Sequence, residues 1–249
     1  MRVILLLTIS LLLIACGPVK EVDITADWSV EKLYRSARSN LDEGNYLTAI
    51  EQYENLESRF PFGQYATQAQ LDVAYAYLKF DEPESASAAV ERFIKLNPRH
   101  ETVDYAYYLR GLINFGRGGS ILDNLQKRDP ADYDKTIMIR AFDDFQLLIR
   151  RFPNSRYAAD ARQRTLYLRE KLAQADLRVA SYYASRSAWV AAVNRTKEIL
   201  LNYQGTSVIP STLQIQLQAY ENLGLSELAE STRRIIRLNA FESNTQASG

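Results

Sequence analysis

Cysteine and histidine are almost absent from this sequence of 249 residues, which contains one of each, Cys16 and His100. A single cysteine cannot form a disulfide framework or a cysteine-based metal site. A single histidine excludes a histidine metal triad, and His100 lies in the turn-forming stretch NPRHETVD. We therefore predict that His100 is a loop residue and that the protein holds no metal ion and no cofactor.

Side chains arranged for catalysis are also scarce. Asp143 and Asp144 are adjacent in a helical stretch, where neighbouring side chains diverge by about 100°, which favours a solvated face over a carboxylate pair. The stretch GRGGS lacks the lysine and the preceding strand of a phosphate-binding loop. The sequence predicts that the chain is not an enzyme, although a lipid-anchored cell-wall hydrolase with helical decoration remains an alternative.

No excess of positive charge is present, because 30 basic residues are matched by 30 acidic ones. Nucleic-acid binding requires a basic face. The basic run TRRIIR at 232–237 is typical of the solvated side of a helix. We expect no nucleic-acid partner.

The longest apolar run lies at the beginning of the chain, between Arg2 and Cys16. A spanning helix needs about 20 apolar residues, so a run of about thirteen is more typical of a secretory signal. The ending LIAC resembles a bacterial lipobox, in which the cysteine is acylated after cleavage. We predict a signal peptide over 1–15, a lipid-anchored Cys16 carrying acyl and diacylglycerol groups, and a tether over 16–29. An ordinary signal peptide cut near a chance cysteine is the alternative.

The residue after the cysteine is Gly17. In Gram-negative lipoproteins of this type, a residue other than aspartate there resembles the signal for the outer membrane. Three acyl chains would attach the protein essentially permanently. The expected location is the outer membrane of a Gram-negative bacterium, anchored in its inner leaflet and facing the periplasm.

Glycine and proline are few, 10 and 7 in the whole chain, and they mark the helix ends in a sequence segment that occurs twice. AIEQYENLESRFPFGQYATQAQ at 49–70 and AFDDFQLLIRRFPNSRYAADAR at 141–162 share an initial alanine, Arg-Phe-Pro and Tyr-Ala. Proline ends each helix because it lacks an N–H group and restricts the residue before it. A helix, a stop and a restart at matching places predict a repeat architecture.

The spacing of small and aromatic residues in the first copy resembles the tetratricopeptide repeat, a helix-turn-helix unit of 34 residues. The resemblance implies an all-α, right-handed solenoid of about five repeats and about ten helices. We assign repeats 1–3 to 30–153, repeats 4–5 to 154–240, and a disordered tail to 241–249. The matching residues are Leu33, Ala37, Gly44, Tyr46, Ala49, Tyr53 and Pro61.

Two irregularities interrupt the repeat. The surplus segment 116–135 begins with flexible glycines and contains Asp-Pro, which predicts a long loop that is either a harmless insertion or a functional contact. The segment 155–186 has neither glycine nor proline. It predicts one helix of about 30 residues, about 45 Å long, that joins two halves of the solenoid.

A recognition surface is expected where the first helices of successive pairs line the concave wall. Tyrosine suits such a surface, because each ring offers an apolar face and a hydroxyl group to an extended peptide. Core packing of some of these residues is the alternative. The predicted peptide groove comprises Tyr34, Arg38, Leu71, Tyr75, Tyr105, Tyr108, Leu112 and Phe115, with Leu41 and Leu78 on the same stripes.

Beyond the generic repeat, the lipobox and the blocks PFGQY, AAVERFIKLNP, VDYAYYLRGL, FPNSRYAADA and AWVAAVNR together resemble the BamD (ComL) family of outer-membrane assembly lipoproteins. The resemblance covers nearly all of residues 16–240, whereas the sequence of the segment 116–135 differs from that of the family. It implies a subunit of the β-barrel assembly (BAM) complex. The N-terminal pairs would receive the C-terminal signal of unfolded barrel proteins, and the C-terminal pairs would dock the barrel-forming subunit and other lipoproteins.

A pilotin-like repeat lipoprotein, which delivers a secretin or type IV pilus component, is the alternative assembly role. It would share the lipobox and the solenoid. It would lack the PFGQY and AWVA blocks.

Overall fold

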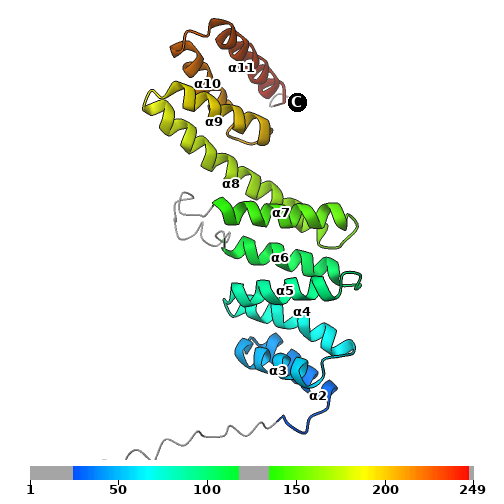
Figure 1. The fold of residues 1–249 in the computed structure, drawn as a ribbon. Helices are drawn as coiled ribbons and strands as arrows, with labels where there is room; N and C mark the ends of the chain where they lie inside the picture. The colour runs from blue at the N-terminus through cyan, green and yellow to red at the C-terminus, as the bar shows by residue number, and fades with distance from the viewer. Residues whose placement is uncertain (1–24, 118–134, 247–249) are drawn as a thin grey trace, which may run out of the picture.

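The computed structural model describes residues 25–117 and 135–246, and in these ranges it contains ten α-helices and no strand (Figure 1). The all-α prediction of about ten helices is confirmed. The signal peptide, Cys16, and residues 118–134 of the predicted loop lie outside the described residues. The helices are α2 (Val30–Glu43), α3 (Tyr46–Arg59), α4 (Gln64–Lys79), α5 (Pro83–Leu96), α6 (Val103–Arg117), α7 (Lys135–Arg151), α8 (Ala158–Ser185), α9 (Trp189–Asn202), α10 (Ile209–Asn222) and α11 (Ser226–Gln246).

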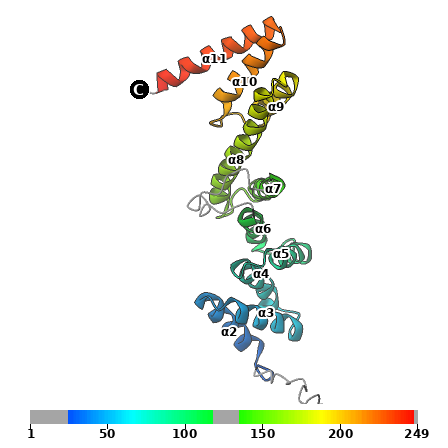
Figure 2. The ribbon, with the colours of Figure 1, turned by 90° about the vertical axis from the view of Figure 1, so that its left-hand side faces the viewer.

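The helices form five hairpins, α2/α3, α4/α5, α6/α7, α8/α9 and α10/α11, and each helix packs against the next along the chain. Successive pairs stack into the elongated solenoid visible in Figure 1. In Figure 2, α2 and α4 lie on one side of the stack and α3 and α5 on the other. First helices also contact one another, α2 with α4, α4 with α6, and α8 with α10. The predicted solenoid of helical repeats is confirmed.

Local signals set the helix boundaries. The Ser29 hydroxyl accepts a hydrogen bond from the amide of Lys32 and so caps α2. Gly44 ends that helix in the left-handed conformation, with φ of 84°, which costs a glycine little because it has no Cβ. Each predicted proline stop falls two residues after a helix end: α3, α5 and α7 end at residues 59, 96 and 151, before prolines at 61, 98 and 153.

Small residues allow close approach within the pairs. Ala37 and Ala49 are fully buried where α2 meets α3, and the fully buried ring of Tyr53 fills space beside them. In the third pair, a Cβ atom on Gly111 would lie 2.6 Å from the ring of Phe145. The approach of α6 to α7 therefore depends on glycine at this position.

The longest helix, α8, has 28 residues and is about 42 Å long at 1.5 Å per residue. The prediction of one long helix here is confirmed. Leu168 and Leu172 of α8 belong to the same core cluster as Phe145 of α7. Farther along, Ala173 and Ala180 pack in a cluster with Ile199 of α9. One continuous helix thus joins the third pair to the last two.

Both ends differ from the sequence expectations. Residues 25–29, assigned to the tether, are packed on the end of α3, and Thr25 is buried. At the other end, α11 continues to Gln246, into the segment assigned to a disordered tail. Of the helices within 25–117 and 135–246, none combines the length and apolarity needed to cross a membrane.

Candidate peptide-binding surface

Most of the predicted groove residues are partly accessible on α2, α4 and α6. Arg38 is exposed, and the side chains of Tyr34, Tyr75, Tyr105, Tyr108 and Leu112, together with Leu78, are half-buried. The structure contradicts the prediction for three residues. Leu71, Phe115 and Leu41 are 1%, 6% and 5% exposed, so they belong to the core rather than to a groove.

Neighbouring helices explain this burial. Phe115 lies on the same stripe of α6 as Tyr108, but its ring packs on Phe145 of α7 and on Tyr167 of α8, with centroids 6.1 and 5.8 Å away. The guanidinium of Arg164 covers it further, 4.9 Å from its centroid. Leu71 and Leu41 belong to the cluster shared by the first two pairs. The length of α8 and the contacts between first helices therefore cover part of the predicted stripe.

The first polar cluster on this surface surrounds the carboxylate of Asp72 on α4, which is 5% exposed. The hydroxyls of Tyr34 and Tyr53 donate hydrogen bonds to its Oδ2 atom, at 2.8 and 3.4 Å. The amide of Gln68 donates to Oδ1 at 3.0 Å, and Arg38 Nη1 lies 3.6 Å from the same oxygen. Side chains from α2, α3 and α4 therefore converge on one carboxylate.

Burial governs the protonation of this cluster. It raises the pKa of Asp72 above its ordinary value, although hydrogen bonds from Tyr34 and Gln68 and the charge of Arg38 act in the opposite direction. Burial, followed by the nearby Asp72 charge, also raises the pKa values of Tyr34 and Tyr53. Both hydroxyls therefore stay protonated and keep donating at neutral pH.

The second cluster joins α6 to the beginning of α8. The rings of Tyr108 and Tyr157 are stacked, with centroids 4.8 Å apart and planes at 15°, and the Tyr105 ring lies 5.2 Å from Tyr157. The Tyr108 hydroxyl donates to Asp160 Oδ2 at 2.6 Å, and Arg164 Nε donates to the same oxygen at 2.5 Å.

The electrostatics of the second cluster differ from those of the first. Burial, aided by the hydrogen bond to Asp160, raises the pKa of Tyr108 to about 12. For Asp160, burial acts to raise the pKa, but the hydrogen bonds from Arg164 and Tyr108 outweigh it and the pKa is lowered. This carboxylate is therefore held ionised, as part of an ion pair.

Tyr105, whose ring lies beside that of Tyr157, packs against the same core cluster as Tyr34 and Tyr75. Its pKa is raised mainly by burial and then by the proximity of Tyr157, Tyr75 and Asp72. The Tyr65 ring lies 5.2 Å from the ring of Tyr34. We call this set of rings the tyrosine face; it consists of Tyr34, Tyr65, Tyr75, Tyr105, Tyr108 and Tyr157.

The sequence prediction missed Tyr65 and Tyr157. These residues occupy the same place in the two copies of the repeated segment, in the Tyr-Ala that follows Arg-Phe-Pro. In both copies the ring packs against a tyrosine of the preceding first helix, at Tyr34 and at Tyr108. The repeated Tyr-Ala was therefore a usable signal, and it places a ring where two first helices meet.

The arrangement suits binding rather than proton transfer. Half-buried tyrosine rings offer apolar faces to side chains and hydroxyl groups to a peptide backbone. The two carboxylates already accept hydrogen bonds from neighbouring side chains. Within the described parts of the chain, no group of three or more histidine, cysteine, aspartate or glutamate side chains could hold a metal ion.

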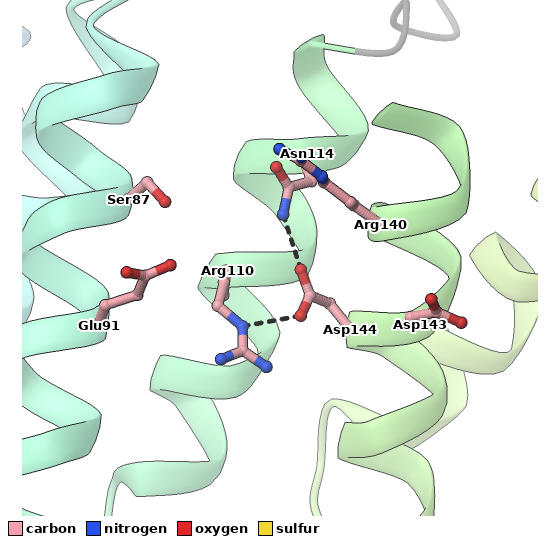
Figure 3. A pocket seen from close by; sticks show the side chains of 7 residues that line it. All are labelled: Ser87, Glu91, Arg110, Asn114, Arg140, Asp143 and Asp144. Atoms are coloured by element: carbon pink, nitrogen blue, oxygen red, sulfur yellow. Dashed lines mark hydrogen bonds and ion pairs between the residues drawn. The ribbon is translucent and has the colours of Figure 1, made fainter. Parts of the chain in front are cut away.

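A separate polar depression of about 390 Å³ lies among α5, α6 and α7 (Figure 3). Asp144 was expected on a solvated face, but its side chain is only 14% exposed and lies 2.7 Å from Arg110 Nε. The amide of Asn114 donates to it at 2.7 Å. Burial raises its pKa against the effect of Arg110, whereas Asp143 is exposed. The contacts of Asp144 join α6 to α7.

The sequence matches proteins of known families. The family model YfiO, described as outer membrane lipoprotein, matches residues 26–235. A relative from Neisseria meningitidis serogroup A, named outer membrane protein assembly factor BamD, is 45% identical, and the alignment covers 96% of this chain and 91% of the relative. A relative of the same name from Vibrio cholerae is 42% identical over 94% of this chain and 96% of its own.

Proposed function

The chain belongs to the outer membrane lipoprotein family YfiO, and from this premise we propose that it is a scaffold subunit of the β-barrel assembly complex rather than an enzyme. Its relatives carry the name outer membrane protein assembly factor BamD. The elongated stack of five helix pairs supports a scaffold role, because such solenoids present long surfaces to partners.

The tyrosine face is the proposed receptor for the C-terminal targeting signal of unfolded barrel proteins. The observation that carries this proposal is the set of half-buried tyrosine rings, in which Tyr34 packs on Tyr65 while Tyr105 and Tyr108 pack on Tyr157. An extended peptide with alternating apolar residues and an aromatic end could place its side chains between the rings. Backbone groups of the peptide would find hydroxyl partners there.

The C-terminal pairs are the proposed docking site for the periplasmic domains of the barrel-forming subunit and for other lipoproteins of the complex. Large apolar side chains are exposed there: Val190 and Leu201 of α9 at 63% and 75%, and Leu228 and Leu238 of α11 at 46% and 67%. Exposed apolar surface of this kind is typical of interaction sites. Acyl groups on Cys16 would hold the protein in the inner leaflet of the outer membrane.

Fluorescence titration with a synthetic peptide ending in an aromatic residue tests the receptor role. Truncating both Tyr105 and Tyr108 to alanine should weaken binding by about 30-fold or more, at about 1 to 2 kcal/mol for each ring. The matched control is Tyr182→Ala on α8, which removes a tyrosine that is 58% exposed and lies outside the tyrosine face. Circular dichroism verifies that each variant is folded. Unchanged affinity in the folded double variant would exclude the tyrosine face as the receptor.

Isolation of the lipid-anchored chain in mild detergent tests the assembly role. We expect a barrel-forming subunit and other lipoproteins of the assembly complex among the recovered proteins. Recovery of a secretin ring in their place would support the pilotin-like alternative.

A further inference from the structure

The point at which the chain enters the solenoid is fixed by Arg59, at the end of α3. Its guanidinium donates hydrogen bonds to the carbonyl oxygens of Thr25, Ala26 and Trp28, at 2.7, 2.6 and 3.1 Å. The Asn55 amide adds a hydrogen bond to Thr25 Oγ1 at 2.9 Å. The segment before α2 is therefore held against the end of α3.

Three residues beyond Arg59, the α3–α4 turn exposes an aromatic ring. Phe62 is 90% exposed, and it lies between Pro61 and Gly63, neither of which has a polar side chain. Packing within the chain does not explain why an aromatic ring occurs at position 62, because Phe60, two residues earlier, makes the contact between this turn and the core.

The corresponding turns of the other pairs do not present an aromatic residue. The third position after the end of α5 is Arg99, after α7 it is Asn154, and after α9 it is Gly205, all of them exposed. The aromatic tip therefore does not follow from the repeat, since these turns form without one. It occurs at the turn beside the entry point of the chain.

That entry point is close to the proposed lipid anchor. Thr25 lies nine positions after Cys16 (25 minus 16), and at about 3.3 Å per position the two are at most about 30 Å apart. Since Arg59 holds Thr25 at the end of α3, the α3–α4 turn stays within a short distance of the bilayer that would carry the acyl groups.

We propose that the α3–α4 turn is a second membrane contact, in which Phe62 enters the interface of the lipid surface that holds the anchor. This proposal rests on the lipid anchor proposed at Cys16. Other side chains at this end suit an interface: Trp28 is half-buried, and the Lys32 ammonium lies 4.3 Å from its ring centroid. Tryptophan and basic side chains are favoured at membrane interfaces. Two contacts would fix the orientation of the solenoid on the membrane, which attachment at a single point cannot do.

The test uses the full lipid-carrying chain in vesicles of phosphatidylethanolamine and phosphatidylglycerol with brominated acyl chains. An environment-sensitive dye is attached through Gln64→Cys, an exposed position that leaves Phe62 in place. The dye reacts there alone, because acylation consumes the thiol of the only natural cysteine. A second protein carries the dye through Arg156→Cys, the equivalent position after the third pair, between α7 and α8.

Quenching by brominated lipid should be greater at position 64 than at position 156 by about twofold or more. Adding Phe62→Asn, which gives the turn the residue of its third-pair equivalent, should reduce quenching at position 64 to about the level at 156. Equal quenching at both positions, or no effect of Phe62→Asn, in a chain that floats with the vesicles overturns the second contact and leaves the anchor intact.

Other outcomes are equally decisive. A chain that does not float with the vesicles overturns the anchor and the second contact together. The third outcome is that lipid alone does not quench the dye at position 64, and that the dye becomes shielded from solvent only when the barrel-forming subunit is added. This outcome assigns Phe62 to a protein partner and overturns the membrane contact.

Discussion

Tyr108 and Tyr157 lie face to face across the boundary between the third and fourth helix pairs, with ring centroids 4.8 Å apart and planes at 15°. They are 49 residues apart in sequence (157 minus 108), and the Tyr108 hydroxyl is directed to Asp160 at 2.6 Å. The stack therefore packs α6 against the start of α8. The same side chains belong to the tyrosine face, so the proposed binding surface and a packing contact share atoms.

Tyr157→Ala should destabilise this boundary. The variant loses ring contacts to both Tyr105 and Tyr108, and we expect a cost of about 1 to 3 kcal/mol, because the ring is half-buried. Tyr157→Phe is the control: it keeps the ring and removes only the hydroxyl that accepts from exposed Arg156. Urea denaturation followed by circular dichroism measures both. Equal midpoints for the two variants would show that the stack contributes nothing to stability.

Gly111→Ala should be destabilising for a steric reason. The added Cβ would lie 2.6 and 2.7 Å from two carbons of the fully buried Phe145 ring, and overpacking of this kind costs about 1 to 3 kcal/mol. In the same helix, Gly116 is exposed and has no atom within 4 Å of an added Cβ. Gly116→Ala should therefore be neutral, or more stable by up to about 1 kcal/mol through helix propensity. Thermal unfolding compares the pair, and similar melting temperatures would contradict the close approach of α6 to α7.

The helix pairs could be predicted from the sequence because their signals are short-range. Ala37, Gly44 and Ala49 occupy repeat positions that only small residues fill, and each proline stop requires only its local neighbours. The long helix α8 was likewise visible as a stretch without glycine or proline. These features depend on residues that are close in sequence.

The surface was less predictable, because it depends on contacts between distant segments. The burial of Phe115 follows from α8 passing over it, and no periodicity within α6 contains that information. The two copies of Arg-Phe-Pro illustrate the same limit. Arg59 binds the carbonyls of the entering chain, whereas Arg151 donates to the hydroxyl of Tyr107 at 2.7 Å. Identical residues at equivalent positions thus have different partners.

Cys16→Ser should abolish the proposed anchor. The motif LIAC followed by Gly17 implies that acylation requires the thiol, which serine lacks. We expect an unprocessed or soluble chain that takes up no label from a palmitate analogue, while the unaltered chain is labelled and recovered with membranes. Label persisting on the serine variant would place the acyl groups elsewhere.

Asp72→Asn should change how stability depends on pH. The folded protein raises the pKa of Asp72 above its ordinary value of 3.8, chiefly by burial, so the folded state binds more protons than the unfolded state between those two values. The free energy of unfolding contributed by Asp72 is then fully present below about pH 4 and is lost as the pH rises through the folded pKa. Relative to Asp72→Asn, the unaltered protein should therefore lose stability as the pH rises above about 4 and through the folded pKa of Asp72.

Asp160→Asn provides a control of opposite sign. Hydrogen bonds from Arg164 and Tyr108 outweigh burial and lower the pKa of Asp160, so its contribution is present above its ordinary value and is lost as the pH falls through the folded pKa. Urea titrations of the three proteins, extended from below pH 4 upward so that Asp160 titrates within them, give two difference curves, in which the other acidic groups cancel. The curve for Asp72 should fall with pH, and the curve for Asp160 should rise where the group titrates. Two curves with the same slope would show that burial does not dominate the pKa of Asp72. The hydrogen bonds from Tyr34 and Gln68 would then stabilise the ionised carboxylate of Asp72 as effectively as the ion pair stabilises that of Asp160.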